Sequence, residues 1–282
     1  MPLLAAAQDH CSRIIPLSPS LAEIVYQLGL GGHVVGRTRY SHYPPEIRRV
    51  TALGGLLDPN LEAIVALRPT TVLALIESKE RLRALSSFGI QPLFFDHRSL
   101  KDILFSIRAL GEACGRMRES EALVQRLQHS IEAVRSVTAQ RDAPSVMIVV
   151  GGESAQGNLR NVFISGSDGY YSELLSIARG TNVMRGVTAP ASGFSLEGII
   201  ELNPEIIIEV QPPSTDSKGT LQAIRRAWSQ LPSLSAVQRG RVYLLDSDYA
   251  TIPGPRFDLL LRDFVRLLHG EEVAKEILLL HE

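Results

Sequence analysis

Hydrophobic and polar positions along the chain follow two patterns that alternate with each other. Short apolar runs such as 13–17 and 72–75 predict buried strands. Apolar residues at helical spacing follow each run, and the first such stretch, 21–28, comes after Ser18-Pro19-Ser20, which is typical of a helix start. The same patterns predict further helices at 61–67, 80–88, 257–268 and 271–280, and further strands at 34–36, 92–95, 146–150 and 206–210. This alternation favours parallel sheets covered by helices.

One part of the pattern occurs twice. The helix, proline and apolar strand of 61–73 return in the same register at 196–208. Glu23 in the first copy is matched by Glu173, which lies 150 positions later. A single repeat of long period indicates a duplicated lobe, because a solenoid needs at least three short units. We therefore predict an α/β protein of two similar lobes, each a sandwich of a parallel sheet and helices.

Between 99 and 140 the pattern is helical alone. Apolar residues mark one face in the first half and another in the second, and Gly115 is the interruption. A helix of about 40 residues would extend roughly 60 Å at 1.5 Å per residue, which is long enough to connect two lobes. The predicted segments are 1–12, a leader remnant or disordered stretch; 13–98, the N-terminal lobe; 99–140, a linker helix; and 141–282, the C-terminal lobe.

Composition and charge limit the classes of protein to consider. The 282-residue chain is 45% hydrophobic and 21% charged, as ordinary globular proteins are. Its net charge is −1, so neither nucleic acid nor an anionic membrane is predicted as a partner. No stretch approaches the roughly 18 consecutive apolar residues of a membrane span. We predict a soluble monomer.

The N-terminus and the cysteines bear on the compartment. Residues 1–8 have small side chains at alternating positions, which suit signal peptidase, so we predict a truncated secretory leader; a disordered cytosolic terminus is the alternative. Cys11 is not preceded by the run that a lipoprotein anchor requires. Cys11 and Cys114 are the two cysteines of the chain. They form either a disulfide or two separate thiols in apolar surroundings, and the second interpretation is favoured.

Several short motifs occur in an order that resembles a known family. The strand at 13–17 and the helix with Glu23 are followed by Val35-Gly36, by the segment Tyr40-Ser41-His42-Tyr43-Pro44-Pro45, and by Asn60-Leu61-Glu62-Ala63-Ile64. Over about 13–268, this order resembles the helical-backbone, or class III, periplasmic binding proteins of ABC importers, which carry cobalamin, ferric siderophores or haem. The segment 40–45 is most similar to the cobalamin-binding members.

The resemblance carries expectations about fold and function. It implies a chelatase-like body of two lobes, a metal chelate held in the cleft between them, and a stiff linker that permits little hinge motion. It also implies a periplasmic location and delivery of the ligand to a membrane permease and ATPase complex. No cofactor is expected, because the chelate is the ligand that is transported.

Loops that follow strands are expected to supply the ligand contacts, because ligands bind at the carboxyl ends of strands in open α/β sheets. Tyr40 and Tyr43 offer flat faces for a macrocycle, and the two prolines after Tyr43 keep its loop out of helix and sheet. The predicted ligand-binding residues are Tyr40, Tyr43, Leu57, Ile76, Tyr170, Phe194, Tyr249 and Arg256. For Phe194 a core position is the competing interpretation. A lone His42 predicts no metal site.

The resemblance also implies one acidic contact in each lobe for the permease. Glu80, near the start of the predicted helix 80–88, and Asp216, in the loop after strand 206–210, are the predicted docking residues. The competing interpretation is that each carboxylate stabilises a helix N-terminus.

Enzymatic motifs are absent from the sequence. It contains no Gly-x-Ser-x-Gly elbow, no HExxH and no phosphate-binding loop, and its 7 histidines are scattered. We therefore predict a binding protein without a catalytic step, with cobalamin as the first ligand and ferric siderophore or haem as the alternative. Alternatives of another class are a chelatase-like enzyme acting on a tetrapyrrole and a receptor for free zinc or manganese, for which His42, His97, Asp246 and Asp248 are the available ligands.

Overall fold

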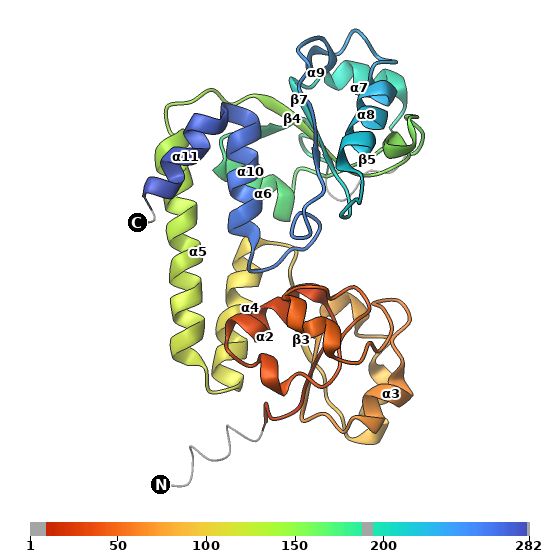
Figure 1. The fold of residues 1–282 in the computed structure, drawn as a ribbon, viewed down its shortest axis with the longest axis vertical. Helices are drawn as coiled ribbons and strands as arrows, with labels where there is room; N and C mark the ends of the chain where they lie inside the picture. Colours follow the sequence, from red (N-terminus) through yellow and green to blue (C-terminus); the bar gives the residue numbers. More distant parts are fainter. Residues whose placement is uncertain (1–9, 188–193, 281–282) are drawn as a thin grey trace. The chain divides into compact units, whose positions relative to one another are not determined.

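The computed structural model describes residues 10–187 and 194–280, and within it the chain forms two compact units (Figure 1). The first unit runs to Gln128 and takes in Ile252–Pro255. The second comprises His129–Thr251 and the residues from Arg256 onward. After Thr251 the chain therefore returns to the first unit for four residues, Ile252–Pro255. The predicted division of the lobes at 140 did not include this return.

The first unit contains a parallel sheet in the order β1-β2-β3. Its strands are β1 (Ile14–Pro16), β2 (Thr71–Leu75) and β3 (Leu93–Phe95). Its helices are α2 (Pro19–Gln27), α3 (Leu61–Ala66) and α4 (Leu100–Ala113), with 3-10 turns η1 (Gly31–His33), η2 (Pro45–Arg49), η3 (Ile76–Ser78) and η4 (Arg83–Phe88). The helix starts follow from side-chain caps: Ser18 accepts a hydrogen bond from the Leu21 N–H, and Asn60 accepts one from the Ala63 N–H.

The second unit contains a five-stranded sheet in the order β5-β4-β7-β8, with β6 also paired to β4. Its strands are β4 (Ser145–Gly151), β5 (Phe163–Ile164), β6 (Thr181–Asn182), β7 (Ile206–Val210) and β8 (Val242–Leu245). Its helices are α6 (Tyr170–Ile177), α7 (Leu196–Leu202), α8 (Ser217–Trp228), α9 (Ser235–Gln238), α10 (Phe257–His269) and α11 (Glu271–Leu279), with the 3-10 turn η5 (Ser154–Gln156). Strand β5 is antiparallel and the other pairs are parallel.

The core of the second unit follows the alternation of side chains along its strands. Met147, Val149 and Ile207 pack in one buried cluster with residues of α7, α8 and α9, including Trp228. The intervening strand residues are buried on the opposite face, where α6 and α10 lie (Figure 1). The repeat is confirmed as helix and strand in both copies: α3 with β2, and α7 with β7.

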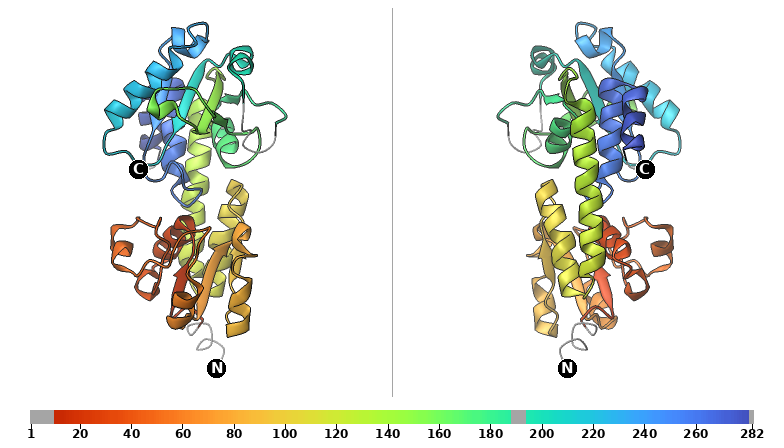
Figure 2. Two further views of the ribbon diagram at one scale, coloured as in Figure 1. Left: turned by 90° about the vertical axis from the view of Figure 1, so that its right-hand side faces the viewer. Right: turned by 90° about the vertical axis from the view of Figure 1, so that its left-hand side faces the viewer.

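The predicted linker 99–140 is two helices rather than one. Helix α4 ends at Ala113 and α5 (Met117–Thr138) begins three residues after Cys114, because Gly115 takes a left-handed φ of +66° between them. The two helices lie side by side (Figure 2), and a Cβ on Gly111 of α4 would come within 2.2 Å of the Ser120 Oγ. Helix α5, about 33 Å long at 1.5 Å per residue, contains the boundary between the units, after Gln128.

The two cysteines form a disulfide, so the favoured interpretation of two separate thiols was wrong. The Cα atoms of Cys11 and Cys114 are 5.4 Å apart and their sulfur atoms are bonded. Cys11 lies just before β1 and Cys114 follows the last residue of α4. The bridge therefore joins the start of the first sheet to the turn between α4 and α5.

Two predicted elements are shorter or different in kind. The strand expected at 34–36 is a single bridge between Val34 and Ile14. The helix expected at 80–88 consists of a turn and the 3-10 segment η4, in which Ser86 donates its hydroxyl to the Arg83 carbonyl at 2.8 Å, a local bond that competes with α-helix. Among the described residues, no helix is both long enough and apolar enough to cross a membrane.

Candidate functional site

Three large hydrophobic side chains are exposed on loops of the first unit, and a fourth, Ile76, is exposed at the start of the 3-10 turn η3. The exposed fractions are 56% for Tyr40, 36% for Tyr43, 72% for Leu57 and 46% for Ile76. Ile76 directly follows β2, and the other three belong to the loops between η1 and α3. We call these four residues the apolar group. All four were predicted as ligand contacts, and their exposure is compatible with that role.

Hydrogen bonds from the Arg37 side chain fix the loop that carries the two tyrosines. The Arg37 guanidinium donates to the carbonyl oxygens of Val50, Thr38 and Ser41, at 3.0, 2.9 and 3.2 Å. The Thr38 and Ser41 hydroxyls are buried and bonded to each other at 3.2 Å. These bonds satisfy the backbone of an irregular segment, so its shape is defined although it is neither helix nor strand.

The ring of Tyr40 is positioned by two neighbours. The guanidinium of Arg39 lies 5.9 Å from the ring centroid and is ion-paired with Asp58. On another side, the ring lies so close to Gly55 that a Cβ there would be 2.9 Å from a ring carbon. A glycine at 55 therefore makes room for Tyr40.

The structure places Tyr170 in the core, contrary to the prediction that it contacts ligand. Tyr170 is 5% exposed, and it shares the inner face of α6 with Leu174. Its neighbour Tyr171 donates its hydroxyl to the Ala250 carbonyl at 2.8 Å, and burial raises the pKa of that hydroxyl well above its usual range. Phe194 is partly buried and packs against the core of the second unit.

Tyr249 and Arg256 are brought together by the loop after β8. The Arg256 guanidinium lies 5.7 Å from the Tyr249 ring centroid and donates from Nη1 to Asp248 Oδ1 at 2.8 Å. Tyr249 donates its hydroxyl to Asp263 Oδ2 at 2.7 Å. Arg256 is 7% exposed, and Tyr249 keeps a partly exposed ring.

Phe163 is an exposed aromatic residue that sequence reasoning missed. It is 37% exposed in β5, and its side chain lies 3.4 Å from where a Cβ on Gly151 would be, at the carboxyl end of β4. A two-residue strand leaves no period to detect, so only its position beside β4 identifies it. Phe163 is therefore an exposed aromatic residue at the carboxyl end of a second-unit strand, the region in which ligand contacts were expected.

Buried polar groups lie near the carboxyl ends of both sheets. Glu209 of β7 accepts hydrogen bonds from Trp228 Nε1 at 2.7 Å and from Gln211 Nε2 at 3.2 Å, and its burial raises its pKa. His97, just after β3, is bonded through Nδ1 to Ser20 Oγ at 2.8 Å, and burial lowers its pKa to about 4. The available sequence signals were a glutamate within the isoleucine-rich strand β7 and a histidine soon after the apolar strand β3.

The acids predicted to dock the permease are both exposed. Glu80 lies in the turn between η3 and η4, so it is not at the start of an α-helix. Asp216 is the N-cap of α8, where its Oδ1 accepts a hydrogen bond from the Gly219 N–H at 2.9 Å. Within the described ranges, no three His, Cys, Asp or Glu side chains are grouped closely enough to hold a metal ion.

Known proteins resemble this chain over most of its length. It is 30% identical over 275 residues, 94% of this chain and 79% of the relative, to an uncharacterized ABC transporter substrate-binding lipoprotein, YvrC, of Bacillus subtilis. It is 25% identical to a vitamin B12-binding protein of Pectobacterium carotovorum, over 90% of this chain and 87% of the relative.

Solved structures share its fold. A periplasmic haem-binding protein from Pseudomonas aeruginosa superposes with a TM-score of 0.77 at 21% identity, covering 92% of this chain and 93% of the other. The class III arrangement of α/β lobes was thus predicted correctly from the motif order. The family description, periplasmic binding protein, matches residues 14–249. Since that match spans most of the chain, the chain belongs to the periplasmic binding protein family, whose members bind and carry rather than catalyse.

Proposed function

We propose that this chain is the substrate-binding component of an ABC importer and that it captures cobalamin. The observation that carries the proposal is the apolar group, Tyr40, Tyr43, Leu57 and Ile76, exposed on loops with a bonded framework. Large hydrophobic side chains left exposed on a folded surface need a reason, and binding of a partly apolar ligand supplies one. The vitamin B12-binding relative, similar over nearly the whole chain, supports this choice of ligand.

The charges near these loops favour a ligand without strong negative charge. In the first unit, Arg39 is paired with Asp58 and Arg37 is occupied by backbone carbonyls. A haem with two propionates, or an anionic ferric siderophore, would be bound best by guanidinium groups that point at the ligand. A corrin with amide side chains instead needs flat apolar faces and hydrogen-bonding groups at the rim, which the two tyrosines supply.

The disulfide supports an extracytoplasmic location. Structural disulfides persist in the periplasm and outside the cell, whereas the cytosol keeps thiols reduced. The bridge between Cys11 and Cys114 therefore fits a protein that is exported before it folds. The relatives described as a lipoprotein and a vitamin B12-binding protein fit the same compartment.

The visible absorption spectrum tests the ligand. The purified protein is incubated separately with cyanocobalamin, haemin and a ferric siderophore, and is then desalted. We expect the corrin bands to stay with the protein in stoichiometric amount and the other two chromophores to be removed. Retention of haemin alone would replace cobalamin by haem and leave the importer assignment intact.

We expect Tyr43→Ala to weaken cobalamin binding by about 1–3 kcal/mol, the usual range for removing an aromatic anchor. Thermal stability should change little, because Tyr43 is exposed and its loop is fixed by Arg37. Titration calorimetry measures the affinity. Phe105→Ala is the matched control, because Phe105 is an exposed aromatic residue of α4 in the same unit, outside the apolar group. Equal losses of affinity in both variants would contradict the assignment of Tyr43.

We also propose that Glu80 and Asp216 dock the permease, one in each lobe. Reversing both charges, with Glu80→Lys and Asp216→Lys, should abolish stimulation of the transporter's ATPase, because the arginines expected on the permease would meet like charges. Cobalamin affinity in solution should not change. Asp216→Asn keeps a cap for α8, so it separates loss of charge from loss of the helix start. Full stimulation by the double Lys variant would leave these acids with local roles only.

A further inference from the structure

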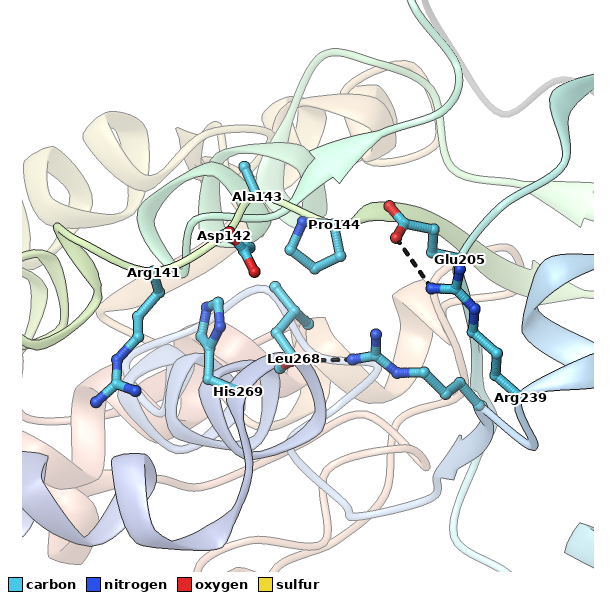
Figure 3. Close-up of a pocket in the computed structure, with 9 residues that line it drawn as sticks. Arg141, Asp142, Ala143, Pro144, Glu205, Arg239, Leu268 and His269 are labelled. Atoms are coloured by element: carbon cyan, nitrogen blue, oxygen red, sulfur yellow. Dashed lines mark hydrogen bonds and ion pairs between the residues drawn. The ribbon is translucent and has the colours of Figure 1, made fainter.

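A cavity of about 450 Å³ lies at the amino-terminal edge of the second unit's sheet (Figure 3). It is formed where the loop before β4, the residues just before β7 and β8, and the end of α10 meet. The apolar group belongs to the first unit, and Phe163 lies at the carboxyl end of β4, so this cavity is separate from the proposed cobalamin site. Its size falls within the roughly 300–1,000 Å³ that is usual for small-molecule sites.

The side chains that line this cavity include more basic than acidic groups: Arg141, Arg239, Arg241 and His269, with Asp142 and Glu205. One acid, Glu205, has its charge engaged at the sheet edge: its Oε2 accepts from the Ser145 N–H at 2.9 Å and the Ser145 hydroxyl at 3.3 Å. The Ser145 N–H is the main reason that the pKa of Glu205 is lowered. Arg239 adds a long contact of 3.4 Å at the protein surface, which is a weak pair.

The hydrogen bonds of Arg241 to α10 use only some of its N–H donors. Its Nη2 donates to the Leu268 carbonyl at 2.9 Å and to the Leu267 carbonyl at 3.4 Å, so it caps the end of α10. A guanidinium carries five N–H groups, and those two bonds use Nη2 alone. Arg141, which also lines the cavity (Figure 3), has a 3.5 Å contact with Glu276 of α11. Arg179 approaches the same loop, because its Nε donates to the Arg141 carbonyl at 2.7 Å.

His269, the last residue of α10, lies on the wall of this cavity. Its Nε2 faces the Ala178 carbonyl at 2.8 Å and must donate to it, so the neutral ring keeps a lone pair on Nδ1. Burial lowers the pKa of His269; the bond to Ala178 opposes this, and the charges of Arg141 and Arg241 lower the pKa further. Asp142 is the acid that acts on the ring in the opposite sense. Along α10, the charged residue closest to His269 in sequence is Arg266, which forms an ion pair with Asp263 at 2.9 Å.

We propose that this cavity binds a small multivalent oxyanion, of the phosphate or polycarboxylate class, and that His269 takes up a proton when the anion binds. Guanidinium groups match both oxyanion types because their fork of donors fits paired oxygens. An anion between Arg141 and Arg241 would cancel the two charges that disfavour the imidazolium. The protonated ring then has a second donor, Nδ1–H, for the bound anion.

Titration calorimetry on the full chain tests the proposal, with sodium phosphate and sodium citrate as probes and sodium chloride at the same ionic strength as reference. We expect saturable binding of one or both probes, one per chain, that is tighter at pH 6 than at pH 8. The heat should depend on the ionisation enthalpy of the buffer, which shows proton uptake. His269→Gln keeps a donor for the Ala178 carbonyl and should remove the part of the buffer dependence that is due to the histidine, leaving only the proton exchange of phosphate or citrate itself. Binding of phosphate alone or citrate alone identifies the class.

Two arginine variants and a control complete the test. Arg141→Gln, at an exposed position, and Arg141→Gln with Arg241→Gln should weaken binding at least tenfold, whereas Arg226→Gln on the exposed side of α8 should not. If the double variant loses its circular dichroism signal, Arg141→Gln decides alone. The proposal is overturned if neither probe binds saturably, if Arg141→Gln binds as wild type does, or if Arg226→Gln weakens binding equally.

Discussion

Replacing both cysteines, with Cys11→Ser and Cys114→Ser, is expected to lower the free energy of unfolding by about 2–5 kcal/mol. The bridge closes a loop of 103 residues, so its loss releases a large part of the unfolded chain. In the loop-entropy model, closing about 100 residues is worth close to 4.7 kcal/mol, and native-state terms change that figure. Urea unfolding followed by circular dichroism measures the difference.

The reductant provides the control for the disulfide. Adding dithiothreitol should destabilise the wild-type protein to about the level of the double Ser variant, and should leave the variant where it is. Cobalamin binding should persist in the variant under native conditions, because the bridge joins the segment just before β1 to the turn after α4, whereas the loop that carries Tyr40 and Tyr43 is held by Arg37. Equal stability of the two proteins without reductant would mean that the bridge contributes nothing to the folded state.

The lobes could be predicted because their signals are local and repeated. The unit of helix, proline and strand at 61–73 and 196–208 appears in the structure as α3 with β2 and α7 with β7. Caps at Ser18 and Asn60 fix where two helices begin, and both are visible in the sequence. The pattern could not show the left-handed turn at Gly115 as the end of a helix, because an isolated glycine is also tolerated within one.

The exposure of the predicted aromatic residues was inferred more fully in the first unit than in the second, for a physical reason. Tyr43 lies directly before Pro44 and Pro45, which exclude helix and sheet, so the exposure of Tyr43 and of Tyr40 in the same segment could be inferred from the sequence. Tyr170 instead starts a helix whose buried positions include Leu174, four residues on, and this spacing was the missed sign of a core residue. The disulfide and the exposure of Phe163 depend on contacts between distant segments, which no local pattern contains.

Trp228 offers the sharpest test of the second unit's core. It is fully buried at the end of α8, packs in the cluster that covers β4 and β7, and donates its indole N–H to Glu209. Trp228→Ala should cost about 3–5 kcal/mol of unfolding free energy, because it leaves a large cavity. Trp228→Phe keeps an aromatic ring in the core and removes the donor, so it should cost less, about 1–3 kcal/mol for a buried acceptor that loses its partner.

The pH dependence of the unfolding free energy separates the effect of the lost Trp228–Glu209 hydrogen bond from the effect of the lost side-chain volume. Burial already raises the pKa of Glu209, so the folded protein holds that proton at pH values where the unfolded chain has released it. Stability therefore falls as the pH rises from the carboxyl's ordinary value through its raised value. Trp228 opposes the raised pKa by bonding to the carboxylate, and Trp228→Phe should raise it further.

Urea unfolding of wild type and Trp228→Phe between pH 4 and pH 8, followed by circular dichroism, measures this effect. The stability gap between the two proteins should widen as the pH rises, because the indole N–H stabilises the ionised carboxylate of Glu209 more than the protonated carboxyl group. Combining Trp228→Phe with Glu209→Gln removes the charge and should make the remaining gap independent of pH. A gap that is the same at every pH in the single variant would show that Trp228 stabilises this core through its volume alone.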